Sequence, residues 1–334
     1  VSQWQTGDHI TLVRNPKYNW GPSFVQSGAP KIQSLVFRLI TNEATQTAAF
    51  QSGELDELSS VPTTAITRLQ SSHKYQITKY LRQGVGLFME FNIQKAPFND
   101  VRVRQAINYA IDKRPIMQIG INGFGSPAYG VLPPTIFGYW PGITTYRYSY
   151  DQKKALALLA QAGWVMKNGT LTKGGKPFTF TLYTTNIDSW KRSALVLQSE
   201  LQHIGIQMNI QNFEFGTLLS KAAAGVQQAD FLGYTYSDPD ILYIWFDSKN
   251  IGTGLANSHD NDPHIDALIA QMRSTTDATK RKAVIADLQR YIADQALWLP
   301  LWTNNNYIAF QPRVHGSFLD AEGNVILNNA TLSS

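Results

Sequence analysis

The sequence predicts an α/β fold divided into two lobes. Its 334 residues exceed what a single hydrophobic core usually organises, so two lobes are the expected arrangement. Residues 178–211 have the pattern of a strand, a helix and a strand with minimal connections, which is typical of a parallel βαβ crossover. Because no low-complexity linker or internal repeat is present, we expect strand crossings that act as a hinge between the lobes.

The N-terminal part of the chain predicts strands and one capped helix. Residues 9–14 alternate between apolar and polar and stop at Asn15-Pro16, where proline restricts the backbone of the preceding residue. Asn42 is placed to cap a helix over 42–52, and Gly53 suits the left-handed position after it. Further strands are expected at 34–40, 75–80 and 85–91.

Helices and strands alternate through the rest of the chain. Asp100 begins a helix over 101–111, a capped segment follows at 150–162, and a short strand in a hairpin lies between Asn168-Gly169 and Gly174-Gly175. In the βαβ unit, helix 188–204 carries apolar residues at spacings of three or four, namely Trp190, Ala194, Leu197, Leu201 and Ile204. The remaining expected elements are helices over 217–224, 264–273 and 277–294 and strands at 230–234, 297–302 and 307–310.

Composition excludes several classes of protein. Lys and Arg number 29 against 24 Asp and Glu, and the basic residues are scattered, so nucleic-acid binding is not expected. The absence of cysteine excludes disulfides, thiolate nucleophiles and Cys-ligated zinc. No apolar run is long enough to span a membrane. Because the chain opens with Val1 and has no leader-like segment, we expect a processed or truncated product whose targeting signal has been removed.

No pattern for catalysis, a cofactor or a metal is found. Gly120, Gly123 and Gly125 lack the spacing of a dinucleotide fingerprint and follow a helical stretch, and no Gly-x-Ser-x-Gly elbow occurs. Residues 259–264 crowd His and Asp together, but Asp262 before a proline is better explained as a helix cap than as a metal ligand. We therefore expect no catalytic residue, no cofactor and no bound metal.

Several segments, in a shared order and spacing, carry a resemblance to a known family. They are residues 7–8, 10–12, 14–18, 49–56, 90–92, 96–106, 108–112, 201 with 204–206, and 236–240. Together, from about residue 7 to residue 316, they resemble the family 5 extracellular solute-binding proteins, which include oligopeptide-, dipeptide- and nickel-binding components of ABC importers. The resemblance implies a two-lobe periplasmic-binding-protein-like fold of type II, in the peptide-binding cluster, that encloses a solute at a hinge.

The same resemblance sets expectations for location, partners and lobe boundaries. It implies an exported or lipid-anchored protein that works outside the cytoplasmic membrane with the permease of an ABC importer, and we expect it to be a monomer. Residues 1–92 with 302–334 are expected to form part of lobe I, and residues 93–301 lobe II. The resemblance also leads us to expect that this chain lacks a further N-terminal portion that family members carry.

The first candidate ligand contacts lie where a strand ends. Tyr234, Thr235 and Tyr236 lie at the expected carboxyl edge of the sheet, where open α/β sheets bind ligands. The alternative for this turn is a helix start, with Asp238 as cap and Pro239 in the first position. Peptide binders of the family carry an Asp where this chain has Thr235. Because a buried ammonium without a carboxylate partner costs several kcal/mol, we do not expect a peptide held by its free N-terminus.

Aromatic loops and one expected crossing supply the remaining candidates. Trp140 and Tyr139 belong to a loop, where exposed aromatic residues often mark recognition, and Trp245 is suited to stack on a sugar or to line a side-chain pocket. Asn92 is included because it lies at an expected crossing. Trp190 is better explained as part of the core.

These observations favour a non-catalytic function. We expect the substrate-binding component of an ABC importer, which binds a peptide or a similar small solute between two lobes. An oligosaccharide is the main alternative ligand because of Thr235 and the aromatic loops. A hydrolase or a ligand-sensing ectodomain would also be compatible with the sequence, and a hydrolase would be distinguished by turnover of peptides or glycosides.

Overall fold

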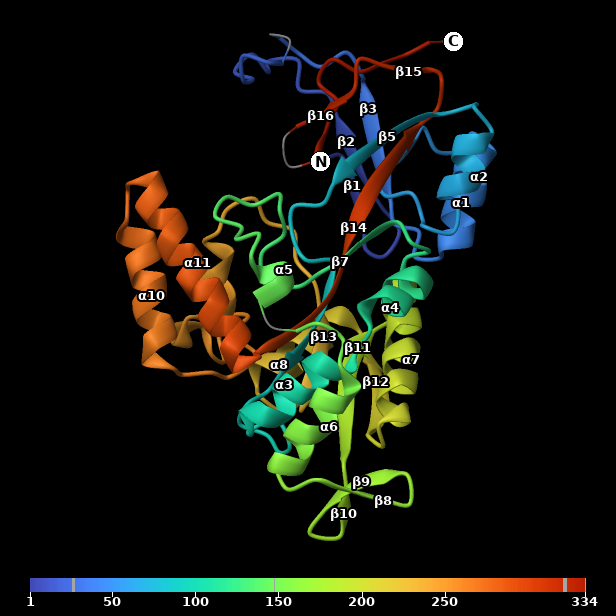
Figure 1. The fold of residues 1–334 in the computed structure, drawn as a ribbon. Helices are drawn as coiled ribbons and strands as arrows, with labels where there is room; N and C mark the ends of the chain where they lie inside the picture. The colour runs from blue at the N-terminus through green and yellow to red at the C-terminus, as the bar shows by residue number, and fades with distance from the viewer. Residues whose placement is uncertain (26–27, 147, 321–322, 334) are drawn as a thin grey trace. The chain divides into compact units, whose positions relative to one another are not determined.

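The chain separates into two compact units in the computed structural model, which describes residues 1–25, 28–146, 148–320 and 323–333. Unit 1 comprises Val1–Leu81 and Asn305–Ser334, and unit 2 comprises Arg82–Asn304 (Figure 1). The chain therefore crosses between the units twice. The first crossing lies before strand Leu87–Phe91, since this strand pairs with two strands of unit 2.

The described residues of unit 1 form small antiparallel sheets and two short helices. Asn42 caps α1 as predicted, because its Oδ1 accepts a hydrogen bond from the Thr45 N–H at 2.9 Å. β4 and β5 pair with the C-terminal half of β14 (Trp298–Phe310), while β1, β2 and β3 form a sheet of their own. The elements of this unit are β1 (Gln3–Gln5), β2 (His9–Val13), β3 (Ser34–Arg38), α1 (Glu43–Gln51), β4 (Glu57–Leu58), α2 (Ile66–Ser71), β5 (Gln76–Leu81), β15 (Val314–His315), β16 (Phe318–Leu319), β17 (Val325–Ile326) and β18 (Thr331–Leu332).

A mixed sheet forms the centre of unit 2, with strand order β12-β11-β13-β6-β14. The predicted βαβ crossover is confirmed: β11 and β12 pair in parallel, and α7 (Asp188–His203) connects them. β6 is antiparallel to both of its neighbours, and β7 pairs with a later part of β14. The strands are β6 (Leu87–Phe91), β7 (Gly125–Pro127), β11 (Thr179–Thr185), β12 (Gln207–Phe213), β13 (Ala229–Leu232) and β14 (Trp298–Phe310).

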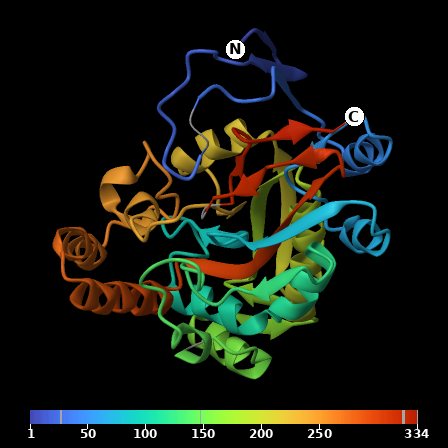
Figure 2. The ribbon, with the colours of Figure 1, turned by 90° about the horizontal axis from the view of Figure 1, so that it is seen from above.

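Helices surround this sheet in pairs. α3 packs with α6, α4 with α7, and α10 with α11 as an antiparallel pair that is seen side by side in both views (Figures 1 and 2). A separate hairpin is made by β8 (Val165–Lys167), β9 (Thr170–Lys173) and β10 (Lys176–Pro177), as the glycine pairs predicted. The remaining helices are α3 (Val101–Ala110), α4 (Lys113–Gly120), α5 (Ile143–Tyr146), α6 (Gln152–Gln161), α8 (Phe215–Ala223), α9 (Ile241–Phe246), α10 (Pro263–Ser274) and α11 (Ala278–Gln295).

Side-chain caps explain where most of these helices begin. An Asx side chain accepts a hydrogen bond from a backbone N–H of the first turn and so satisfies a donor that has no partner within the helix. The residues that do this are Asn42, Asp100, Asp112, Asp151, Asp262 and Asp277. Helix α4, which the sequence analysis does not predict, also begins in this way. Asp112 follows the end of α3 and caps the new helix.

The last long strand corrects the sequence-based expectation. Two strands were expected at 297–302 and 307–310, whereas β14 runs without a break from Trp298 to Phe310. The intervening Thr-Asn-Asn-Asn looks like a loop in the sequence, but Thr303 lies opposite Ser126 and Asn305 lies opposite Leu81 in ladders. Pairing with distant strands therefore overrides the low strand propensity of asparagine.

The packed interior lies mostly in unit 2. Its largest fully buried side chains include Phe88, Phe91 and Phe180, and Trp190 is only 7% exposed, in agreement with its expected place in the core.

Within the described residues, none of the helices is both long and apolar enough to span a lipid bilayer.

Candidate ligand-binding face

The segment after β13 is fixed to the chain where it enters unit 2. The Tyr234 N–H donates to the Val85 carbonyl at 2.9 Å, and the Tyr236 N–H donates to the Gln83 carbonyl at 2.6 Å. The Arg82 side chain donates through Nε to the Tyr234 carbonyl at 3.2 Å. The strand end that the sequence indicated thus lies beside the first residues of unit 2.

Two glycines allow this close approach. Gly84 has φ +150°, which side chains rarely adopt, and a Cβ atom there would collide with the Tyr234 carbonyl oxygen. At Gly86, a Cβ atom would collide with the indole of Trp302. Gly84 therefore lets segment 82–86 approach the Tyr234 backbone, and Gly86 lets the same segment pack against the Trp302 indole.

Tyr234 and Trp245 are buried anchors of this face. Tyr234 is 6% exposed, its hydroxyl donates to the Val131 carbonyl at 2.7 Å, and burial raises its pKa. Trp245 meets Phe88 and Trp298 edge-on, at centroid distances of 5.2 and 5.3 Å. Such aromatic packing holds the backbone beneath the exposed part of the segment.

Thr235 and Tyr236 face solvent. Thr235 is exposed, and 39% of Tyr236 is accessible. The turn that follows is held by Asp238, whose Oδ1 accepts the Asp240 N–H at 2.8 Å, while helix α9 begins one residue later, at Ile241. The carboxylate therefore stabilises the turn before the helix and does not serve as the helix cap itself.

Two ion pairs tie this turn to the α10–α11 pair. Arg273 Nε lies 2.9 Å from Asp240 Oδ1, and Arg281 lies 3.6 Å from Asp238 Oδ1. The Arg273 guanidinium also stacks over the Tyr243 ring at 3.9 Å. Each pair is partly exposed, so each contributes little stability alone. Together they connect the turn to two helices.

Tyr139 and Trp140 lie in a loop that is attached to α11. Gln289 donates through Nε2 to the Gly138 carbonyl at 2.8 Å, and the Arg290 guanidinium lies 4.9 Å from the centre of a Trp140 ring. Both aromatic side chains are partly exposed, and partial burial raises the pKa of Tyr139. This loop therefore presents partly exposed aromatic surface.

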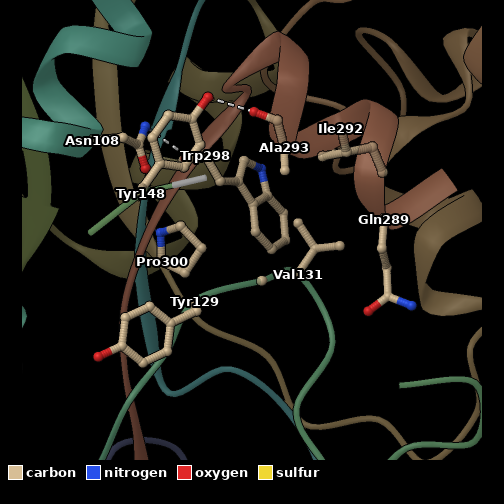
Figure 3. A pocket seen from close by; sticks show the side chains of 10 residues that line it. Asn108, Tyr129, Val131, Tyr148, Gln289, Ile292, Ala293, Trp298 and Pro300 are labelled. Carbon is tan, nitrogen blue, oxygen red and sulfur yellow. Dashed lines mark hydrogen bonds between the residues drawn. The ribbon is translucent and has the colours of Figure 1, made fainter. Parts of the chain in front are cut away.

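A small pocket lies beneath these loops, within unit 2 (Figure 3). Its volume is about 20 Å³, and its walls include Tyr129, Val131, Gln289 and Trp298. The Asn108 side chain also borders it, with its Nδ2 donating to the Arg104 and Trp298 carbonyls at 3.1 and 3.2 Å. The space suits about one water molecule and is too small for a peptide.

Asn92 lies at the other end of the β6–β13 ladder from Tyr234. It is 1% exposed, and its Nδ2 donates to the Gly225 and Gln227 carbonyls at 3.2 and 3.1 Å, while its Oδ1 accepts the Gln94 N–H at 3.0 Å. All three contacts are to backbone. Asn92 therefore organises the chain after β6, in a place where it has almost no contact with solvent.

The His- and Asp-rich turn before α10 has the predicted capping role. Asp262 Oδ1 accepts the His264 N–H at 2.8 Å, and its Oδ2 accepts the Tyr291 hydroxyl at 2.6 Å. The His259 ring lies 2.9 Å from the Ala222 carbonyl. Among residues with a described position, no three His, Cys, Asp or Glu gather closely enough to hold a metal ion.

Known proteins resemble this chain along nearly its whole length. The family model for the bacterial extracellular solute-binding proteins, family 5 Middle, matches residues 1–253. Heme-binding protein A of Haemophilus influenzae is 29% identical over 316 residues, which cover 94% of this chain and 55% of that protein. The chain thus spans little more than half the length of this relative.

Solved structures give the same result for the fold. The oligopeptide-binding protein AppA of Bacillus subtilis, in complex with a nonapeptide, aligns with a TM-score of 0.86 at 26% identity, over 99% of this chain and 65% of that chain. DppA of Helicobacter pylori, a periplasmic binding protein in complex with a peptide, aligns with a TM-score of 0.84 at 26% identity, over 99% and 62%. The α/β fold is that of the periplasmic binding proteins, and the chain belongs to the bacterial extracellular solute-binding proteins of family 5.

Proposed function

We propose that the chain is the solute-capturing part of the substrate-binding component of an ABC importer, and that it takes a peptide or a similar small solute. It works outside the cytoplasmic membrane, delivers the solute to a membrane permease and changes no covalent bond. This function is supported by the family to which the chain belongs and by the face around Tyr236.

The observation that carries the proposal is the contrast between backbone and side chains at residues 234–236. The backbone is held by the Val85 and Gln83 carbonyls, and the Tyr234 side chain is buried, yet Thr235 and Tyr236 are open to solvent. A recognition surface that is already rigid loses little conformational entropy when it binds. We assign direct contact with the solute to Thr235 and Tyr236, with Tyr139 and Trp140 as further aromatic contacts.

Two of the remaining candidates support this face. Tyr234 and Trp245 hold the segment through the aromatic cluster, whereas Asn92 organises the backbone at the other end of the β6–β13 ladder. We propose that Tyr234 and Trp245 act on the solute through the segment that they position.

Residue 235 bears on the type of solute. A threonine hydroxyl can donate and accept hydrogen bonds but carries no charge to pair with an α-ammonium. The solute that fits is therefore a peptide bound through its backbone and side chains, or an oligosaccharide that stacks on Trp140 and Tyr236. The named relatives bind a heme, a nonapeptide and a shorter peptide, so the family fold serves several ligand classes.

The test is native mass spectrometry of the purified chain, first as isolated and then with peptide and oligosaccharide pools. The proposal expects one bound small molecule per chain, which is released on denaturation with its mass unchanged. A parallel incubation with both pools should leave them intact. Release of hydrolysis products would show an enzyme instead, and absence of binding to any pool would contradict solute capture by this chain.

A further inference from the structure

Two acidic side chains face each other inside unit 2. Glu90 on β6 and Asp230 on β13 are directly opposite in the antiparallel ladder. Residues opposite each other in such a ladder project to the same side of the sheet, with Cβ atoms about 4.5–5.5 Å apart. Both residues are 0% exposed.

The two carboxyl groups are unequally satisfied. Glu90 Oε1 accepts three hydrogen bonds: from the Ser258 N–H at 2.9 Å, the Ser258 hydroxyl at 2.8 Å and the Trp298 indole N–H at 3.1 Å. Within the described part of the chain, Glu90 Oε2 and both carboxyl oxygens of Asp230 have no hydrogen-bond partner of ordinary geometry; the Gln227 amide acts on Asp230, but its Nε2 donates to the Asn257 carbonyl at 3.1 Å. A buried ionised oxygen without a donor is costly, so these three atoms need an explanation.

Ion pairing does not account for these carboxyl oxygens. Across the described parts of the chain, neither carboxyl group forms an ion pair with Lys, Arg or His. The charge nearest to Glu90 is the like charge of Asp230. Repulsion between two carboxylates disfavours ionisation of both groups.

The titratable and charged groups of the neighbouring elements are engaged elsewhere. On β11, Tyr183 lies opposite Asp230 but packs its ring on Phe213. Asp247 accepts the Lys249 N–H, and the His259 ring contacts the Ala222 carbonyl. Asp260 interacts with Asp262 and Arg104, and Arg104 donates to the Phe98 and Gln295 carbonyls. Lys221 lies over the Phe213 ring.

We propose that Glu90 and Asp230 form a buried proton-binding site, in which one proton is held between Glu90 Oε2 and an oxygen of Asp230 at neutral pH. The protonated carboxyl donates a hydrogen bond to the ionised one, which satisfies the oxygens that lack protein donors. When hydroxide or water removes this proton at alkaline pH, two adjacent buried carboxylates remain, and unit 2 loses stability.

The direction of the pKa shifts agrees with this arrangement. Burial raises the pKa of Glu90 well above its ordinary value, and the nearby Asp230 raises it further. Burial raises the pKa of Asp230 from 3.8 to about 8, against a smaller opposing effect of Gln227. Between these two pKa values of Asp230 the folded chain binds more protons than the unfolded chain, so stability falls as pH rises.

The direct test is infrared spectroscopy of the folded chain near neutral pH. The proposal expects the carbonyl stretch of a protonated carboxylic acid, at a frequency that reports a hydrogen-bonded, water-free site, and loss of this band in both Glu90→Gln and Asp230→Asn. Because the wild-type band is read without any substitution, a variant that fails to fold does not block the test.

The second measurement is the pH dependence of urea unfolding, from about pH 5 to about pH 9. For wild type, each extra proton that the folded chain holds in this window lowers the folding equilibrium constant by up to about tenfold for every unit that the pH rises. Asp230→Asn keeps a hydrogen-bond donor toward Glu90 but removes the titration, so its profile should be flatter than that of wild type. The control Asp287→Asn removes an exposed carboxylate of α11 and should leave the slope unchanged.

Three results would overturn the proposal. One is a wild-type spectrum without a protonated-carboxyl band near neutral pH. Another is a band that persists in both Glu90→Gln and Asp230→Asn. The third is a stoichiometric metal ion that elemental analysis finds in wild type and not in Asp230→Asn, because a cation would then satisfy the oxygens in place of the proton.

Discussion

Gly84 and Tyr234 approach so closely that the backbone of residue 84 leaves no room for a side chain beneath the Tyr234 carbonyl oxygen. The same carbonyl accepts the Arg82 side chain, and Tyr234 donates its own N–H to Val85. Residues some 150 positions apart in the sequence are thereby joined where the chain enters unit 2, and the exposed Tyr236 is held by the same ladder.

Gly84→Ala should weaken both stability and solute binding. The substitution places a methyl group against the Tyr234 carbonyl and forces an unfavourable φ, so the free energy of unfolding should fall by about 1–3 kcal/mol. Urea unfolding and calorimetric titration with the solute measure the two effects. Gly169→Ala is the matched control, because Gly169 also has a positive φ but no described atom near its missing Cβ. Equal effects of both substitutions would contradict a specific role for the contact.

Thr235→Asp should increase the affinity for peptides that have a free α-ammonium. A carboxylate at this exposed position supplies a charge-assisted hydrogen bond, worth about 1.5–3 kcal/mol at best, so the gain should be about tenfold. Calorimetry with a peptide and its N-acetylated form separates the charge effect from other contacts. Thr235→Asn matches the size without the charge and should give no gain. The same affinity for both peptide forms in the Asp variant would place residue 235 outside the binding site.

Lys113 should lose its proton near neutral pH. Its amine is buried, donates to the Ala128 carbonyl at 2.8 Å and lies 5.0 Å from the centre of the Tyr129 ring, and burial lowers its pKa from 10.5 to about 7. Between about 7 and 10.5 the unfolded chain binds this proton and the folded chain does not, so the contribution to stability rises with pH. Nitrogen-15 NMR of the side chain measures the titration directly. A midpoint near that of free lysine would contradict a neutral amine.

The pocket beside Asn108 should contain one ordered water molecule. Asn108 is 1% exposed, its Oδ1 has no donor among the described residues, and the adjacent cavity of about 20 Å³ has room for a single water. A crystal structure at high resolution should show a water that donates to this oxygen. Asn108→Leu fills the space but removes two backbone contacts, and it should lower the free energy of unfolding by about 1–3 kcal/mol. A dry pocket in wild type would contradict the assignment.

Local signals in the sequence predicted the βαβ unit and most helix starts. Apolar residues at helical spacing identified α7, and Asx residues marked the beginnings of α1, α3 and α10. These features depend on contacts within a few residues, which is why pattern and propensity are sufficient to find them. Helix α2 lacks a side-chain cap and is only six residues long, so it gives a weak signal.

Long-range pairing was not visible in the sequence. The asparagines of β14 become strand residues because β5 and β7 lie beside them, and no local pattern announces those partners. For the candidate site, the sequence indicated the turn after β13 but not Arg82, Gly84 or Gly86, which lie beside it. The glycines at 84, 86 and 233 were the available signal, since glycine within a strand pattern often marks a close backbone approach.

Calorimetric titration of the chain with the small molecule that copurifies with it, together with a Tyr236→Ala variant, tests the central claim most directly. The account predicts one solute per chain, recovery of that solute unaltered, and affinity lowered by about 1–3 kcal/mol in Tyr236→Ala, with wild-type stability because the side chain is exposed. Undiminished affinity in Tyr236→Ala would show that the solute binds elsewhere, and a chemically altered solute would show that the chain is not a simple binding protein.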